Sequence, residues 1–282
     1  MQLKFNICRY YRITRIIINI HILMAVITLT TDLGDKDFYQ AALKGSILCI
    51  LPNVNIVDIT HSIAAFNIPQ AAFVLKNAFH YFPTGTVHLI GIDCVYNENM
   101  RYLALQYHGH YFVGSDNGIF SLMFEEAPTE IVEINIIQDL KHLHFPLTDI
   151  FAKACCSIAA GYPLKSIGIP VKHLQEKVNL HPVIEKNIIR ASVIYIDSFQ
   201  NVITNISKDL FSRVQGNRKF KLNFKRSESI TQLSWHYNEV PEGEKLCLFG
   251  ISNNLEIAIN KGNASRLLGL YLNDIVTVEF YP

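Results

Sequence analysis

The stretch from Ile27 to Gly45 reads ITLTTDLGDKDFYQAALKG and predicts a strand, an acidic turn and a helix in succession. Its first residues are apolar or β-branched, which is typical of a buried strand. Apolar and small residues then recur at helical spacing from Phe38 to Leu48, so one face of the helix can pack on a sheet. Such a unit is typical of an α/β domain.

Three carboxylates, those of Asp32, Asp35 and Asp37, occupy the turn between this strand and this helix. Ligands of open α/β sheets bind beyond the carboxyl ends of the strands. A carboxylate at that place can accept hydrogen bonds from the two neighbouring hydroxyls of a sugar. We therefore expect Asp32, at the strand end, to bind a ligand, whereas Asp35 and Asp37 are better explained as caps of the helix.

The bulk composition excludes several classes of protein. With 282 residues, a net charge of +1 and 17% charged residues, the chain has no electrostatic attraction for nucleic acid or for a membrane surface. No apolar run reaches the length of a membrane span. Its six cysteines form no CxxC pair and its histidines no zinc-binding spacing, which predicts free thiols in the cytoplasm and no metal site.

The first 24 residues stand apart from the rest. Four basic residues precede the apolar run Ile16–Leu23, which superficially resembles a signal peptide, but no small-residue cleavage site follows. We expect residues 1–24 to be an N-terminal extension, with Met24 as a candidate start of translation. A disordered or loosely docked segment is the alternative.

The remaining chain changes character near Leu180. Before it, strands and helices alternate, and the nearly all-apolar strand Val87–Ile92 is typical of a central parallel strand. After it, short strands of alternating pattern are separated by Gly and Asn turns. We predict an N-terminal α/β domain with a mostly parallel sheet over residues 25–180 and a smaller C-terminal β-barrel domain over residues 188–282.

Six motifs, in this order and spacing, make the chain resemble the S-adenosylmethionine hydroxide adenosyltransferase family, the relatives of the fluorinase and chlorinase. The resemblance covers roughly residues 26 to 282. The motifs are TTDLGDKDFY at Thr30–Tyr39, NIVDITH at Asn55–His61, HYFPTGTVHL at His80–Leu89, GSDNG at Gly114–Gly118, DSFQNVITNI at Asp197–Ile206 and LEIAINKGNA at Leu255–Ala264.

The resemblance implies an α/β domain followed by a β-barrel, a homotrimer with sites between subunits, and a nucleoside substrate without a further cofactor. It implies the conversion of S-adenosylmethionine and water to adenosine and methionine by displacement at the ribose C5′. Because the sulfonium leaving group is already cationic, no acid is needed to expel it, and the protein has to orient and activate water.

The family's substrate-binding residues carry over by position. Asp32 would bind the ribose hydroxyls, Asp197 the methionine ammonium and Asn201 the adenine edge, while Phe66 would line the ribose pocket and Asn263 would lie beside adenine. For Asp197 to Asn201 a plain β-turn is the alternative. The remaining candidates are Tyr39, Phe199 and Ser252; for Tyr39, packing against the helix is the alternative.

The water-activating residues depart from the family pattern. Asp93 is kept, but Met100 and Pro146 stand at the positions of the family's arginine and histidine. Arg101 and His144 are the nearest replacements, so we predict a rearranged catalytic set of Asp93, Arg101 and His144. Halogenation is disfavoured, since the Asp93 carboxylate would repel a halide.

A non-catalytic protein that binds S-adenosylmethionine or adenosine is the second interpretation. In that case the ligand pocket would have been kept and the water-activating arginine and histidine lost.

Overall fold

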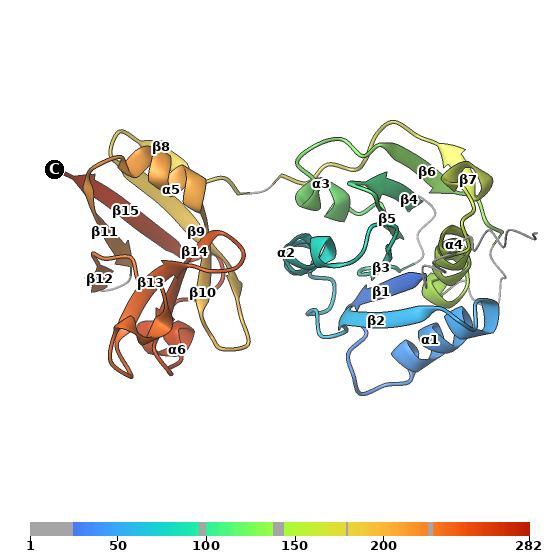
Figure 1. Cartoon of the computed structure of the whole chain (residues 1–282), viewed down its shortest axis with the longest axis horizontal. Helices are drawn as coiled ribbons and strands as arrows, with labels where there is room; N and C mark the ends of the chain where they lie inside the picture. The colour runs from blue at the N-terminus through green and yellow to red at the C-terminus, as the bar shows by residue number, and fades with distance from the viewer. Residues whose placement is uncertain (1–24, 96–99, 138–143, 179, 225–227) are drawn as a thin grey trace, which may run out of the picture.

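The structure, a computed structural model, describes residues 25–95, 100–137, 144–178, 180–224 and 228–282. The extension predicted for residues 1–24 lies outside the described residues. Two β-sheets follow one another along the chain, each with its own hydrophobic core (Figure 1). The predicted fold class, a mostly parallel α/β sheet followed by a barrel-like antiparallel sheet, is confirmed.

The first sheet has the strand order β2-β1-β3-β5-β4-β6-β7. Strands β2, β1, β3 and β5 are parallel, whereas β4, β6 and β7 each run antiparallel to the preceding neighbour in the sheet. The carboxyl ends of β1, β3 and β5 therefore meet at one edge. The strands are β1 Val26–Thr31, β2 Asn55–Thr60, β3 Val87–Gly91, β4 Tyr102–Tyr107, β5 His110–Ser115, β6 Glu130–Ile134 and β7 Gly168–Pro170.

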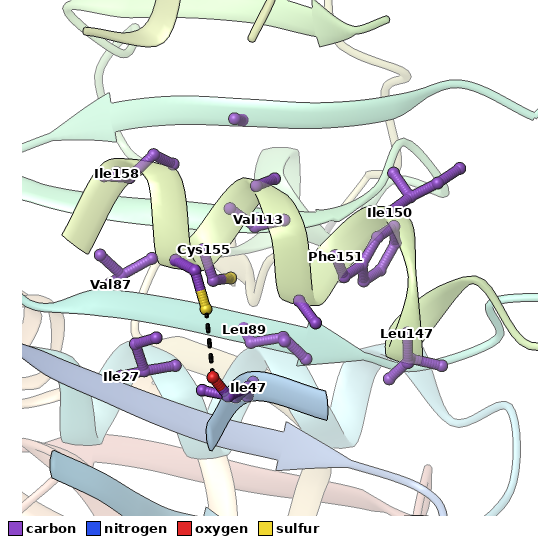
Figure 2. Packing of buried hydrophobic residues seen from close by; sticks show 14 of the residues in the cluster. Ile27, Ile47, Val87, Leu89, Val113, Leu147, Ile150, Phe151, Cys155 and Ile158 are labelled. Carbon is purple, nitrogen blue, oxygen red and sulfur yellow. Dashed lines mark hydrogen bonds between the residues drawn. The ribbon is translucent and has the colours of Figure 1, made fainter. Parts of the chain in front are cut away.

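Helices cover both faces of this sheet. Helices α1 (Tyr39–Ile50) and α4 (Ile150–Ala159) share one core with alternate strand residues such as Leu89 (Figure 2). The Cys156 thiol of α4 lies 3.7 Å from the Ile47 carbonyl oxygen of α1. The strand residues in between, such as Ile90, point to the opposite core. That core holds α2 (Ile68–Ala78), α3 (Ile119–Met123) and the turn η1 (Phe79–Tyr81). No described helix is long and apolar enough to cross a membrane.

The second sheet is antiparallel, in the order β12-β11-β15-β9-β10-β14-β13, and β8 also pairs with β9. A bridge between Leu233 and Cys247 links the segment after β12 to β13 and nearly closes a barrel around a hydrophobic core. The elements are β8 Val183–Glu185, β9 Ile188–Ile196, β10 Val202–Ser207, α5 Lys208–Gln215, β11 Lys219–Phe224, β12 Glu228–Ile230, η5 Tyr237–Glu239, β13 Lys245–Phe249, β14 Asn254–Ile259, α6 Ala264–Leu268 and β15 Ile275–Tyr281.

The segment after β7 leads from one sheet to the other, and its residues His173, Gln175 and Lys177 are bound to the N-terminal part of the chain. Arg101 donates to the carboxylate of Asp116 and, at 3.0 Å, to the carbonyl oxygen of His173. The same Asp116 accepts a hydrogen bond of 2.8 Å from the backbone N–H of Gln175. Asp116 is almost fully buried, so these donors replace the water that it would otherwise bind.

A buried histidine pair packs against Phe79 of the turn η1. The Thr28 hydroxyl is 2.7 Å from Nδ1 of His88, and Nε2 of His88 is 3.3 Å from Nδ1 of His110. Burial lowers the pKa of His88 to about 3, with a further contribution from His110. The folded protein therefore keeps His88 neutral at pH values at which an unfolded chain would protonate it.

Because the pKa of His88 is lowered on folding, the free energy of unfolding should fall as the pH drops from 6.5 towards 3, with a contribution of up to about 1.4 kcal/mol per pH unit. Urea titrations at several pH values measure this slope. The double variant Thr28→Val/His88→Phe removes both partners of the bond and should show a shallower slope. If the double variant has the same slope as the wild type, His88 is not the source of the pH dependence.

Replacing Arg101 by Met should lower the free energy of unfolding by about 2 kcal/mol, because it leaves the buried Asp116 carboxylate short of a charged donor. The matched control is Lys76→Met, which removes an exposed ion pair with Glu125 of 2.8 Å and should cost less than about 1 kcal/mol. Equal losses of unfolding free energy for the two variants in denaturant titrations would show that the Arg101–Asp116 pair stabilises the protein no more than an exposed ion pair does.

Candidate active site

The carboxylate of Asp32 is anchored by backbone donors at the carboxyl edge of the first sheet. Asp32 follows β1 directly, and its Oδ2 accepts hydrogen bonds from the backbone N–H of Phe66 at 2.9 Å and of Asp93 at 3.3 Å. Its own N–H donates to the carbonyl oxygen of Gly91 at 3.3 Å. Three residues predicted from the sequence, on three separate segments, are thus brought together.

Both donors adopt a backbone conformation that is unusual for a residue with a side chain. Phe66 has φ 64° and Asp93 has φ 49°, in the left-handed region. Such residues cost free energy, on the order of 1 kcal/mol or more each, and cluster at functional sites. Here the conformation turns each N–H towards Asp32. Oδ2 of the Asp32 carboxylate is thus held by the protein. Oδ1 has no hydrogen-bond partner among the residues described.

The thiol of Cys94 packs beneath the Asp93 turn. It lies 3.4 Å from the carbonyl oxygen of Ile92 and accepts a hydrogen bond of 3.4 Å from the Ser115 hydroxyl. Burial raises its pKa to about 12, and the nearby carboxylates of Asp32 and Asp93 contribute. The thiol therefore stays protonated and is a structural group rather than a nucleophile.

The three predicted catalytic residues occupy different surroundings. Asp93 lies at the Asp32 turn, whereas the guanidinium of Arg101 is bound to Asp116 and His173 as described above. His144 is exposed just before the turn η3 (Pro146–Thr148). Within the described part of the chain, no hydrogen bond or ion pair joins any two of Asp93, Arg101 and His144.

Aromatic side chains surround this edge of the sheet. The ring of Tyr39 lies 4.5 Å from that of Phe38 and 5.5 Å from that of Phe145, centre to centre. This contact brings the start of α1 against the segment that carries His144. Phe66 is 62% exposed, although large apolar side chains are usually buried. Its ring is available to a ligand or to another chain.

A second candidate cluster lies at the turn between β9 and β10. Asp197 accepts hydrogen bonds from the backbone N–H of Asn201 at 2.8 Å and from its side-chain amide at 3.0 Å. Phe199, at the tip of this turn, is 80% exposed. The β-turn expected as the alternative to a ligand role for Asp197 to Asn201 is therefore present. The Asp197 carboxylate lies at its base.

Glu256 and Tyr237 belong to the same face, and sequence analysis gave them no role. The Tyr237 hydroxyl donates to Glu256 at 2.7 Å. Burial raises the pKa of Glu256, the Tyr237 hydrogen bond lowers it in part, and the charge of Asp197 raises it further. The available signal was a glutamate inside the otherwise apolar strand β14.

Ser252 and Asn263 have local roles in the structure. The Ser252 hydroxyl accepts a hydrogen bond of 3.4 Å from the backbone N–H of Asn254 in the turn before β14. Asn263 is the N-cap of α6, with its side-chain oxygen 2.7 Å from the backbone N of Arg266. These bonds use one acceptor of each side chain and define the shape of the loops around β14.

Taken together, the two clusters present hydrogen-bond acceptors in surroundings rich in exposed aromatic rings. Carboxylates of this kind bind hydroxyl and ammonium groups, and an amide such as that of Asn201 both donates and accepts. Among the described residues there is no cluster of His, Cys, Asp and Glu that could hold a metal ion. The arrangement fits a polar organic ligand with hydroxyl and cationic groups.

Comparisons with known proteins cover both sheets. The model of the S-adenosylmethionine hydroxide adenosyltransferase N-terminal domain matches residues 27–168, and that of the C-terminal domain matches residues 191–277. A protein of Methanocaldococcus jannaschii named (R)-S-adenosyl-L-methionine hydrolase is 31% identical over 262 residues, which cover 90% of this chain and 95% of the relative.

More distant relatives and solved structures agree. A protein named fluorinase from an Actinoplanes species is 25% identical over 170 residues, 51% of this chain and 57% of its own. The crystal structure of an uncharacterized conserved protein from Thermotoga maritima superposes with a TM-score of 0.80 at 29% identity, covering 90% of this chain and 99% of that one. The chain belongs to the S-adenosylmethionine hydroxide adenosyltransferase family.

Proposed function

We propose that this protein is an S-adenosylmethionine hydrolase that forms adenosine and methionine. Four relatives, each matched over at least 85% of this chain, are named (R)-S-adenosyl-L-methionine hydrolase. The observation that carries the proposal to this chain is the Asp32 carboxylate, held by two backbone N–H groups at the strand end. That geometry leaves a pre-oriented acceptor for the ribose hydroxyls.

The reaction is a displacement at C5′ of the ribose. The oxygen of water forms a bond to C5′ while the C5′–S bond breaks. The electron pair of the broken C5′–S bond stays on sulfur, which becomes the neutral thioether of methionine. The proton of water passes to a base. We assign this role to Asp93, whose backbone is fixed next to Asp32. No cofactor is needed, because the leaving group is already activated.

The remaining predicted residues receive roles in the same proposal. Asp197 binds the ammonium of methionine, Asn201 and Asn263 lie at adenine, and Phe66 and Phe199 cover the ligand. Tyr39 and Ser252 lie at the methionine end. Arg101 and His144 assist Asp93 with the water, which for Arg101 requires that it exchange part of its contact with Asp116.

We also propose a cytoplasmic homotrimer in which the Asp32 cluster of one subunit faces the Asp197 cluster of the next. The exposed rings of Phe66 and Phe199 support this arrangement, because a neighbouring chain and ligand would cover them. The described cysteines are all free, which fits a reducing compartment. Sedimentation should give three times the 32.1 kDa of the chain.

The direct test is to incubate the purified protein with S-adenosylmethionine and to follow adenosine and methionine by chromatography with mass detection. Asp32→Asn should lower kcat/KM by about tenfold or more, because it removes a charged acceptor of the ribose hydroxyls. Asp35→Asn is the matched control, since Asp35 bonds only Gln40 and Ser62 among the described residues and should act like the wild type.

A second candidate function is binding without turnover. Met100 and Pro146 at the two water-activating positions favour it, as does the engagement of Arg101 with Asp116. Saturable binding of S-adenosylmethionine by calorimetry, with no adenosine formed, would establish this candidate and overturn the hydrolase.

A further inference from the structure

A chain of polar groups runs behind the Asp32 turn, from the buried Thr31 and His61 out to the exposed Asp58. Nδ1 of His61 lies 2.7 Å from the Thr31 hydroxyl, and Nε2 of His61 lies 3.1 Å from the carboxylate of Asp58. The other oxygen of Asp58 accepts from the Lys44 ammonium at 2.6 Å. Thr31 is fully buried and His61 almost so.

The direction of these bonds follows from the donors. The backbone N–H of Leu33 donates to the Thr31 hydroxyl at 3.3 Å, so the hydroxyl hydrogen is free to point to Nδ1 of His61. Nε2 of His61 lies within ion-pair distance of Asp58 but is not in hydrogen-bonding geometry with it, so the Thr31 hydroxyl is the hydrogen-bond partner of the ring. Burial alone would raise the pKa of Asp58, but the hydrogen bond from Lys44 and the nearby His61 lower it below its ordinary value.

The same histidine also fixes the backbone of the turn. Its carbonyl oxygen accepts a hydrogen bond of 2.8 Å from the N–H of Gly34. The turn from Thr31 to Gly34 is thus bound to His61 at both ends, with Asp32 between them. Five residues after His61, Phe66 donates to the Asp32 carboxylate itself.

We propose that Thr31 and His61 are positioning residues that hold the Asp32 carboxylate in the orientation needed for the ribose hydroxyls. This inference rests on the proposed function of Asp32. An Asp–His–hydroxyl series also occurs where a hydroxyl is a nucleophile, but the burial of Thr31 keeps its oxygen from any substrate. The hydrogen bonds of His61 to Thr31 and Gly34 therefore serve to hold the turn that carries Asp32.

The chain offers a matched control one residue away. Thr30 is also fully buried, and its hydroxyl oxygen has no hydrogen-bond partner among the described residues. Thr31→Val and Thr30→Val remove the same atom at neighbouring positions, and only the first interrupts the series. Thr31→Ser keeps the hydroxyl and should therefore keep the hydrogen bond to His61.

The experiment is calorimetric titration of each variant with adenosine and with 2′,3′-dideoxyadenosine, which lacks the hydroxyl pair. Thr31→Val should weaken adenosine binding about five- to tenfold, the effect of one misplaced hydrogen-bonding group, and leave dideoxyadenosine binding unchanged. Thr31→Ser and Thr30→Val should bind both ligands as the wild type does. A merely structural defect would weaken both ligands together.

Equal losses for the two ligands, or no loss, in Thr31→Val would overturn the positioning role while leaving the role of Asp32 intact. A wild-type protein that does not prefer adenosine to dideoxyadenosine would overturn the ribose contact in the proposed function and this inference with it. Should Thr31→Val fail to fold, His61→Gln, which removes the acceptor at the Nδ1 position of the Thr31 bond, is titrated with the same two ligands, and equal losses or no loss would again overturn the positioning role.

Discussion

Two backbone N–H groups directed at one carboxylate oxygen of Asp32 set the geometry of the N-terminal part of the site. They come from loops that follow different elements of the chain, so the contact requires the parallel order of β2, β1 and β3 to be in place. Both loops reach Asp32 through residues with positive φ. The free energy stored in those residues is offset by charge-assisted hydrogen bonds and the surrounding packing.

The C-terminal part of the site follows a different principle. There a tight turn holds Asp197 through both nitrogen atoms of Asn201, between two strands of an antiparallel sheet. The charge of Asp197 helps to raise the pKa of Glu256 and of Tyr237, after the larger effect of burial. Two carboxylates on one face favour a cationic ligand group, which agrees with the ammonium and sulfonium of S-adenosylmethionine.

Much of the fold could be predicted from the sequence, because several of the strands have a distinct pattern. The apolar run of β3 indicated a strand buried on both faces, and the alternation in β11 indicated one half exposed. Asp32 could be predicted as a site residue because the end of a first parallel strand has a fixed place in the fold.

The side-chain partners could not be predicted in the same way. Arg101 was a candidate for water activation, and its contacts with Asp116 and His173 join residues 15 and 72 positions apart. His61 lay inside a recognised motif, yet its bond to Thr31 depends on the register of β1 and β2. Such contacts arise from tertiary packing, which leaves no local pattern.

The most direct test of this account is a crystal structure of the protein with adenosine and methionine. The account predicts both ribose hydroxyls within hydrogen-bond distance of the Asp32 carboxylate, with the Phe66 and Asp93 N–H groups still bound to it. A ribose bound elsewhere, with Asp32 in contact only with its own backbone donors, would contradict it.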